Sequence, residues 1–215
     1  MPAALPPADF ASARLRLHTV RPGQTFGRIY MAGFPDPLGY GKSRSRFSDP
    51  RRRKADNRFG VLYLGETLAV CFLEAVLRDR KDGVAGELVL EERELEDRRY
   101  VEVETISSLR LVDLRENNAV AMGVPSEVLR GVKQQLGRAW SVAFHDHPNG
   151  ADGIIYPSRL NGHVNLAVYG RAVGKLRPIR LRRLANVAEL APVLDDLDVA
   201  FAPPSSFHAG GGSPP

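Results

Sequence analysis

Short apolar stretches recur along the middle of the chain, and their periods predict strands. The clearest alternation is Tyr-Val-Glu-Val-Glu, at the start of the segment 100–105, where polar and apolar residues take turns. This period of two is typical of a strand with one buried face. Mostly apolar runs bounded by turn-forming residues predict further strands, and these cover 26–31, 61–64, 87–90, 109–114, 153–156, 164–169 and 176–184.

Three other segments have the helical period. Thr67 can cap a helix over 68–80, a Pro-Ser pair opens a second helix over 125–144, and Asn186 can cap a third that extends to about residue 194. Many strands with few interposed helices and no regular alternation predict an α+β fold. The inner stripe of the second helix, which we expect in the core, contains Val128, Leu129, Val132, Leu136, Ala139, Trp140 and Ala143.

The two ends and one internal segment lack both periods. Residues 2–7 are rich in Pro and Ala, and the sequence PPSSFHAGGGSPP at the C-terminal end has few side chains to bury. We therefore predict a flexible segment over 1–13, a single domain over 14–202 and a disordered tail over 203–215. The internal segment, 33–57, is rich in Gly, Pro, Ser and Arg and predicts a long loop of the kind that often binds ligands.

Composition places the chain among soluble globular proteins. Its 215 residues are 43% hydrophobic and 26% charged, which suits one sizeable domain. The apolar stretch over 60–77 is interrupted by Gly65, Glu66 and Glu74, so no membrane-spanning segment is expected. Cys71 is the single cysteine, which excludes an internal disulfide, and the N-terminus lacks the basic-then-apolar pattern of a secretion signal. We expect a cytoplasmic protein.

The formal net charge of +5 is unevenly distributed. One basic group lies in and beside the long loop, and a second lies near the C-terminus. Such groups attract nucleic acid, nucleotide phosphates or an acidic protein partner, and a solvated surface explains them equally well. The first group contains Arg44, Arg46, Arg51, Arg52, Arg53, Lys54 and Arg58, and the second contains Lys175, Arg177, Arg180, Arg182 and Arg183.

Common catalytic and metal-binding motifs do not occur in the sequence. His145 and His147 stand at alternate positions without an evident third ligand, so we interpret them as the end of the preceding helix rather than as a metal site. Neither Ser43 nor Ser158 sits in G-x-S-x-G, and there is no HExxH, CxxC or GxxxxGK(S/T). A zinc site and a hydrolase triad are therefore not expected.

Charged or polar side chains inside apolar segments give a different signal. Arg28 lies in the apolar strand GRIYM, and Glu74 lies in the middle of the helix sequence CFLEAVLRD. A charge in such a place needs water, a partner or a chemical role. Arg28 and Glu74 can form a structural ion pair. Tyr63 in VLYLG can be a core residue, and Ser158 in GIIYPSRLNG can be a turn residue.

Four segments follow one another in an order that a known family shares. They are GRIY, PDPLGYGKSRSRFSDP, FGVLYLGETLAVCFLEAVL and DGIIYPSRLNGHVNLAVYG, and they extend from about residue 26 to residue 169. In this order the chain resembles the RES-domain toxins of bacterial toxin–antitoxin operons. The arginine, glutamate and serine that give the family its name map onto Arg28, Glu74 and Ser158.

The resemblance implies an ADP-ribosyltransferase-like fold, with two small mixed or antiparallel sheets flanked by helices around an NAD+ cleft. Family members consume NAD+ at the nicotinamide–ribose bond and pass the ADP-ribose to water, to phosphate or to a protein target. NAD+ is thus the expected co-substrate, and no metal is expected. The expected partner is an Xre-like antitoxin that covers the active site, so nucleic acid would be met only through the antitoxin.

The chemistry of the mapped residues fits these implied roles. The planar guanidinium groups of Arg28 and Arg46 suit a pyrophosphate. A carboxylate such as that of Glu74 stabilises the oxocarbenium-like ribose cation that forms when the N-glycosidic bond breaks. Tyr63 offers a ring for nicotinamide or a hydroxyl for ribose, and Ser158 can hold ribose or phosphate. The predicted catalytic residues are Glu74, Arg28 and Tyr63, and the predicted NAD+-binding residues are Arg28, Arg46, Tyr63, Ser158 and Tyr40.

Two alternatives stay open at this point. A basic nucleic-acid-binding module without enzymatic activity would use the basic group of the loop. Within the enzyme class, the sequence does not fix the acceptor of the ADP-ribose. Part of the loop group exceeds what one dinucleotide needs, so we predict that it faces solvent at the cleft mouth and recruits an acidic partner. These surplus residues are Arg51, Arg52, Arg53 and Lys54.

Overall fold

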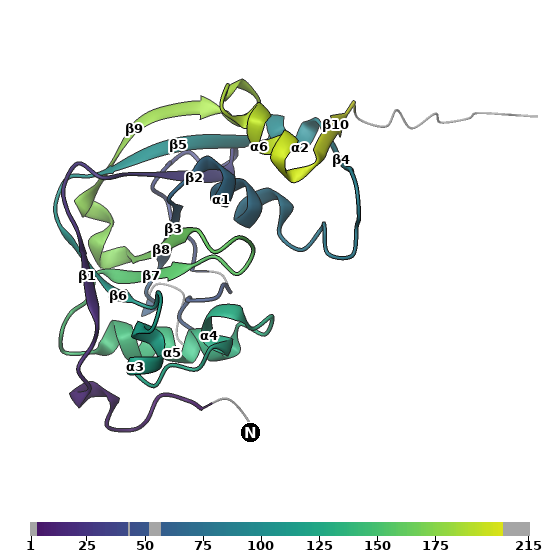
Figure 1. The fold of residues 1–215 in the computed structure, drawn as a ribbon. Helices are drawn as coiled ribbons and strands as arrows, with labels where there is room; N and C mark the ends of the chain where they lie inside the picture. The colour runs from purple at the N-terminus through teal and green to yellow at the C-terminus, as the bar shows by residue number, and fades with distance from the viewer. Residues whose placement is uncertain (1–3, 43, 52–56, 204–215) are drawn as a thin grey trace, which may run out of the picture.

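The computed structural model describes residues 4–42, 44–51 and 57–203 (Figure 1). Within these residues, one curled sheet has eight strands in the order β1-β6-β7-β8-β3-β2-β5-β9. A separate parallel pair contains β4 (Leu88–Glu91) and β10 (Val199–Ala202). The strands of the large sheet are β1 (Leu17–Val20), β2 (Thr25–Met31), β3 (Val61–Gly65), β5 (Arg98–Thr105), β6 (Leu109–Asp113), β7 (Gly153–Pro157), β8 (Val164–Tyr169) and β9 (Leu176–Arg183).

Helices gather in two places along this sheet. Figure 1 shows α3, α4 and α5 together below β6 and β7, and α1, α2 and α6 together near the other half of the sheet. Leu73–Leu77 continues α1 as a π-helical turn. The helices are α1 (Leu68–Phe72), α2 (Arg93–Glu96), α3 (Asn118–Ala121), α4 (Glu127–Arg130), α5 (Gln135–Asp146) and α6 (Leu190–Leu197), with 3-10 turns at Phe10–Ser12, Gly170–Lys175 and Leu184–Asn186.

The two halves of the large sheet meet at a narrow seam between β2 and β3. The register pair that joins these two described strands is Gly27 with Gly65, whereas β2 pairs with β5 along its whole length. The two sheets expected from the sequence are therefore two halves of one curled sheet. The α+β class is confirmed.

Helix α1 packs directly on this seam because the two glycines have no side chains. A Cβ added at Gly65 would lie 2.7 Å from both Cys71 Sγ and Val70 Cγ1. A Cβ added at Gly27 would lie 2.7 Å from the Tyr100 hydroxyl and 3.0 Å from Cys71 Sγ. At both glycines these distances are shorter than van der Waals contact, so a larger residue in the seam would displace the neighbouring side chains, including those of α1.

The core is built from three clusters of buried side chains. One lies under α5 and includes Phe47, Trp140 and Phe144. A second is made mostly of strand residues from both halves of the sheet. The third surrounds α1 and includes Phe72 and Leu184. The third cluster packs α1 against α6 as well as against the strands, so the position of this helix is set by packing on more than one element.

The N-terminal segment is docked on α5 instead of being free along its length. Phe10 is 5% exposed, and its ring meets the edge of Trp140 at a centroid distance of 5.1 Å. The Trp140 indole N–H donates to the carbonyl oxygen of Ala4 over 3.0 Å. Part of the segment predicted as flexible thus makes packing and hydrogen-bond contacts with α5. Residues 1–3 and, apart from Pro203, the predicted tail lie outside the described residues.

The helix predicted over 125–144 is divided into α4 and α5. Gly131 ends α4 in an extended conformation (φ −61°, ψ 135°), and a Cβ there would lie 2.5 Å from the Glu127 carbonyl oxygen. Val132, expected in the inner stripe, is 79% exposed. Asn186 likewise does not cap α6, which begins at Leu190.

The described residues contain no helix that is both long enough and apolar enough to cross a membrane. The longest is α5, over Gln135–Asp146, which packs one face on the core and leaves the other exposed.

Replacing a seam glycine tests the packing of α1. We expect Gly65→Ala to lower the free energy of unfolding by roughly 1–3 kcal/mol, because its methyl group overlaps side chains of α1. Denaturant unfolding measures this change. The matched control is Gly174→Ala, since no atom lies within 4 Å of a Cβ added at Gly174. Equal effects of the two substitutions would contradict the seam packing.

Candidate active site

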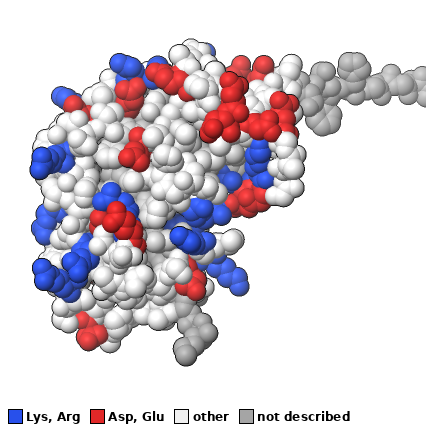
Figure 2. Space-filling view, in the orientation of Figure 1, with Lys and Arg blue, Asp and Glu red and all other residues white. Residues whose placement is uncertain are grey.

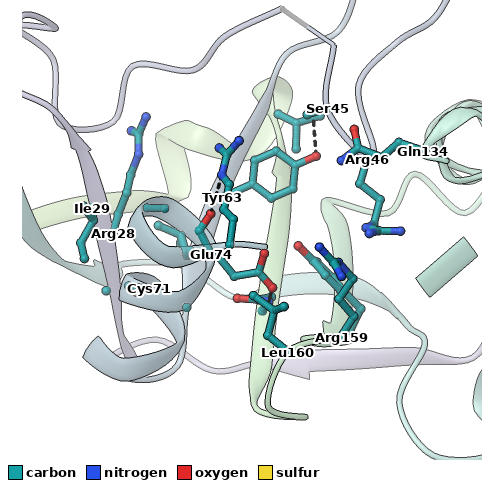
Figure 3. Close-up of a pocket in the computed structure, with 18 of the residues that line it drawn as sticks. Arg28, Ile29, Ser45, Arg46, Tyr63, Cys71, Glu74, Gln134, Arg159 and Leu160 are labelled. Atoms are coloured by element: carbon teal, nitrogen blue, oxygen red, sulfur yellow. Dashed lines mark hydrogen bonds between the residues drawn. The ribbon is translucent and has the colours of Figure 1, made fainter. Parts of the chain in front are cut away.

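A cleft of about 480 Å³ opens between α1, the loop after β2 and the turn that joins β7 to β8 (Figure 3). Four of the residues singled out from the sequence line it, namely Arg28, Arg46, Tyr63 and Glu74. They come from β2, the loop, β3 and the π-helical turn after α1. The fold therefore brings together side chains that are far apart in the chain.

Glu74 is held by two buried donors from the sheet. Ser158 Oγ donates to Glu74 Oε1 over 2.7 Å, and Asn165 Nδ2 donates to the same oxygen over 3.0 Å. Ser158 follows β7 and Asn165 lies at the start of β8; each is 4% exposed. Glu74 and Ser158 are thus in direct contact. The Ser158 hydroxyl donates to the glutamate and does not line the cleft.

The local structure of the helix places Glu74 at the cleft. Thr67 caps α1 as predicted, accepting from the Val70 N–H over 3.2 Å. The helix then widens into a π-helical turn, a feature that is frequent at functional sites. It ends at Leu77, short of the predicted Arg80, because Arg78 has a positive φ of 48°. Arg78 Nε donates back to the Glu74 carbonyl oxygen over 3.0 Å.

Arg28 satisfies its charge with backbone carbonyl groups of the loop. Its Nη1 and Nη2 donate to the carbonyl oxygens of Pro37 and Gly39, each over 2.6 Å. Burial lowers the pKa of the guanidinium, which still remains charged. The alternative ion pair with Glu74 does not occur among the described residues, and Figure 3 shows Arg28 pointing away from that carboxylate. Arg28 therefore fixes the loop that borders the cleft.

Tyr63 uses its hydroxyl to hold the same loop further on. The hydroxyl accepts from the Phe47 N–H over 3.0 Å and lies 2.9 Å from Ser45 Oγ. Burial raises the pKa of this phenol, so it stays neutral. Its ring lines the cleft between the loop and Glu74. The predicted ribose contact through the hydroxyl would compete with this anchoring role, whereas the predicted contact with nicotinamide through the ring would not.

Arg46 joins the loop to the break between α4 and α5. Its Nη1 donates to the carbonyl oxygens of Val128 and Gly131, over 3.2 and 2.9 Å. These carbonyls lie at the end of α4, where the helix dipole favours a cation. Burial, and to a smaller extent the neighbouring Arg159, lowers the pKa of Arg46. Figure 3 shows Arg46 and Arg159 converging on one side of the cleft.

Tyr40 lies outside the cleft lining, against the prediction that it binds NAD+. Its ring covers two glycines: a Cβ added at Gly60 would lie 1.9 Å from a Tyr40 ring carbon, and one at Gly170 would lie 2.8 Å from its hydroxyl oxygen. The side chain is 39% exposed. The contact attaches the loop to the ends of β3 and β8, and this explains the tyrosine without a ligand.

The sequence analysis missed Asn165 and Arg159. Asn165 is an amide inside the apolar strand sequence VNLAVY, which is the same kind of signal that pointed to Glu74. Arg159 lines the cleft from the turn after β7 and forms an ion pair with Asp79 beyond the end of α1. Nothing in the sequence around Arg159 distinguishes it from a surface arginine.

Arg51 of the loop group and most of the C-terminal group are paired with carboxylates. Arg51 Nη2 contacts Asp49 and its Nη1 contacts Asp146, both over 2.7 Å. These ion pairs weigh against the prediction that Arg51 recruits an acidic partner, and Arg52, Arg53 and Lys54 lie outside the described residues. The C-terminal group pairs in the same way, through Lys175–Asp152, Arg177–Glu104, Arg180–Glu102 and Arg182–Glu102.

This pairing weighs against a basic nucleic-acid-binding surface. Figure 2 shows basic and acidic side chains interspersed over the visible face, with acidic ones gathered near α6 and β10. Nucleic-acid affinity depends on unneutralised Lys and Arg that displace counterions. Among the described residues, nearby carboxylates already neutralise Arg51 and most of the C-terminal group.

His145 and His147 have local partners. His145 lies in the last turn of α5, stacks on Phe59 at a centroid distance of 4.1 Å and contacts Asp146. His147 caps the end of the helix, and its ring nitrogens contact the Ala13 carbonyl oxygen and the Asn149 N–H. Their position at the helix end is confirmed. Over the described ranges, no group of three or more His, Cys, Asp or Glu is placed to hold a metal ion.

Comparison with known proteins gives the fold and the family. The structure superimposes on one chain of the crystal structure of the M. tuberculosis MbcT–MbcA toxin–antitoxin complex with a TM-score of 0.55. The match covers 76% of this chain and 85% of that chain, at 20% sequence identity. It shows that the two chains share a fold.

The sequence comparison is more specific. The family model of the RES domain matches residues 16–187, so the chain belongs to the RES-domain family. A curated relative, the "Probable toxin y4kH" of Sinorhizobium fredii (strain NBRC 101917 / NGR234), is 36% identical over 124 residues. That alignment covers 57% of this chain and 98% of the relative. The family resemblance predicted from the residues is confirmed.

Removing the Tyr63 hydroxyl tests its role as a loop anchor. Tyr63→Phe leaves the buried Phe47 N–H without its acceptor, which we expect to cost roughly 1–3 kcal/mol of unfolding free energy. Hydrogen exchange of the Phe47 amide should accelerate at the same time. The control is Tyr30→Phe, because the Tyr30 hydroxyl makes no hydrogen bond within the described residues. Unchanged exchange at Phe47 would show that the hydroxyl is not the anchor.

The reactivity of Cys71 tests the burial of the helix against the seam. Burial raises the pKa of this thiol to about 12, so almost none of it is thiolate at pH 8. We expect alkylation by iodoacetamide at that pH to be roughly 10²- to 10³-fold slower in the folded protein than in guanidinium, because the thiolate is the nucleophile. Equal rates in the two states would contradict the close packing of α1.

Proposed function

We propose that this protein is the toxin of a bacterial toxin–antitoxin pair and that it cleaves the nicotinamide–ribose bond of NAD+. The observation that carries the proposal is the Glu74 carboxylate, held by two buried donors at the side of an arginine-lined cleft. Membership of the RES-domain family and the two toxin relatives support the same assignment.

The cleft suits a dinucleotide in size and in charge. Its volume of about 480 Å³ lies within the usual range for small-molecule sites. Arginines are the residues best suited to phosphate groups, because their planar donors match the oxygens in pairs. The arginines that line the cleft are Arg28, Arg44, Arg46, Arg78 and Arg159.

The proposed reaction needs one carboxylate and no other charged catalytic group. The bond between ribose C1′ and the nicotinamide nitrogen breaks, and its electron pair stays on that nitrogen, so neutral nicotinamide leaves. The ribose carries the positive charge as an oxocarbenium-like cation, which the negative Glu74 carboxylate stabilises. A nucleophile then bonds to C1′ and loses its proton if it carries one. We propose water, phosphate or a protein side chain as this acceptor.

The proposed partner is an antitoxin that covers the cleft. The structure that shares this fold was determined as a toxin–antitoxin complex. A cleft whose wall is a loop anchored by a few side-chain contacts can be closed by a protein that lies across the loop and the turn after β7. We propose an Xre-like antitoxin for this place, with a protein target for ADP-ribosylation as the second kind of partner.

Replacing the carboxylate tests the proposed reaction. Glu74→Gln keeps the shape and removes the charge, so nicotinamide release from NAD+ should fall by roughly 10²- to 10³-fold. Growth arrest on expression should disappear with it. The control is Glu66→Gln, because Glu66 is exposed, lies close in the chain and does not line the cleft. A folded Glu74→Gln protein with unchanged release would refute the mechanism.

The same assay identifies the acceptor. NAD+ labelled in the adenylate is incubated with the wild-type protein, with and without phosphate and with a cell extract. Label in free ADP-ribose indicates water, label in a phosphate ester indicates phosphate, and label on protein indicates a modified target. Retention of all the label in intact NAD+ would contradict the proposed function.

A further inference from the structure

The two donors to Glu74 both end on one carboxylate oxygen. Ser158 Oγ and Asn165 Nδ2 lie 2.7 and 3.0 Å from Oε1. A carboxylate oxygen offers about two acceptor directions, so Oε1 is fully used. No group of the described residues donates to Oε2. This second oxygen is therefore the one that remains available to a ligand in the cleft.

The Asn165 amide is fixed by the sheet and not by the helix that carries Glu74. Asn165 is 4% exposed, and its backbone pairs with Gly65 of β3 on one side and with Tyr156 of β7 on the other. The Ser158 hydroxyl comes from the turn after β7, where the Leu160 N–H donates to it over 3.1 Å. The two donors thus reach Glu74 from two different segments, and the amide comes from a strand inside the sheet.

We propose that Asn165 is a positioning residue, which turns the Glu74 carboxylate so that Oε2 faces the substrate. This inference rests on the proposed NAD+-cleaving function and adds a residue to it. A carboxylate without this amide would be free to rotate about its last bond and to swing with the π-helical turn. A displacement of about 1 Å at a reacting group can cost roughly 10²-fold in rate.

The charges around Glu74 make the role of Asn165 measurable through pH. Cys71 on α1 has a pKa raised to about 12 by burial, and burial raises the pKa of Tyr63 on β3 and of Tyr156 on β7. Arg46 from the loop stays charged although burial lowers its pKa. None of these groups changes charge between about pH 5 and pH 9.

The other charged residues that line the cleft are Arg28, Arg44, Arg78, Asp79 and Arg159. Arg159, after β7, is paired with Asp79. A carboxylate introduced at position 165 is therefore the new titrating group beside Glu74.

The test compares Asn165→Ala and Asn165→Asp with the control Asn161→Ala. Asn161 is exposed in the turn before β8, where its side chain accepts from the His163 N–H over 3.1 Å. Nicotinamide release is measured from pH 5 to pH 9, and thermal melting confirms folding. We expect Asn165→Ala to lower kcat by roughly 10- to 100-fold with KM within about twofold, because substrate binding does not need the amide. The control should keep wild-type kcat.

Asn165→Asp distinguishes positioning from a merely structural role. With one shared proton, the new side chain donates to Glu74 as the amide does; with both carboxylates ionised, the donor is lost and the like charges repel. Activity of this variant should therefore fall as the pH rises, in a range where the wild type keeps its activity. A structural role alone would lower the melting temperature and leave the shape of the pH profile unchanged.

Several outcomes would overturn the inference. Folded Asn165→Ala with kcat within twofold of the control does so, as does a wild-type pH profile for Asn165→Asp. If the alanine variant does not fold, the isosteric aspartate variant decides alone. A wild-type protein that releases no nicotinamide would refute the proposed function itself, which is a different result from an active wild type with unaffected variants.

Discussion

The contact of α1 with a seam that has no side chains is the constraint on which the site depends. Gly27 and Gly65 let Cys71 settle directly on the strands. The chain then widens into the π-helical turn that carries Glu74 to the cleft. The donors to Glu74 come from the neighbouring strands of the same sheet. The helix height above the seam therefore sets the distance between the carboxylate and its partners.

Polar side chains around the cleft hold its walls in place through hydrogen bonds within the protein. Arg28 and Arg46 donate to carbonyl groups of the loop and of α4, and the Tyr63 hydroxyl accepts from the loop backbone. A guanidinium has five N–H donors, so these contacts leave others for an anion. These contacts anchor the described part of the loop and satisfy two half-buried arginines without carboxylate partners.

The sequence pattern identifies a site residue when a polar side chain stands in a segment that should be buried. It does not identify the contact partners that come from distant segments. Glu74 stood out in an apolar helix because an unpaired buried charge is costly. The partner that the sequence suggested for it was Arg28, whereas its partners are Ser158 and Asn165. Tyr40 in the loop was predicted to bind NAD+, yet its ring covers Gly60 and Gly170 and lies outside the cleft lining. The break of the helix at Gly131 could not be predicted from the local sequence. It is stabilised by Arg46, from another segment, which donates to the carbonyl oxygens at the end of α4. Short β1 and β10 have too few residues to show a period.

The docking of the N-terminal segment on α5 gives the molecule an internal optical reporter. Trp140 is the single tryptophan of the chain, is 1% exposed, and is sealed from water by Phe10 and by its hydrogen bond to Ala4. Release of that segment would expose the indole to solvent and move its fluorescence emission to longer wavelength. Tryptophan fluorescence of this protein should therefore follow the attachment of residues 4–13 to α5.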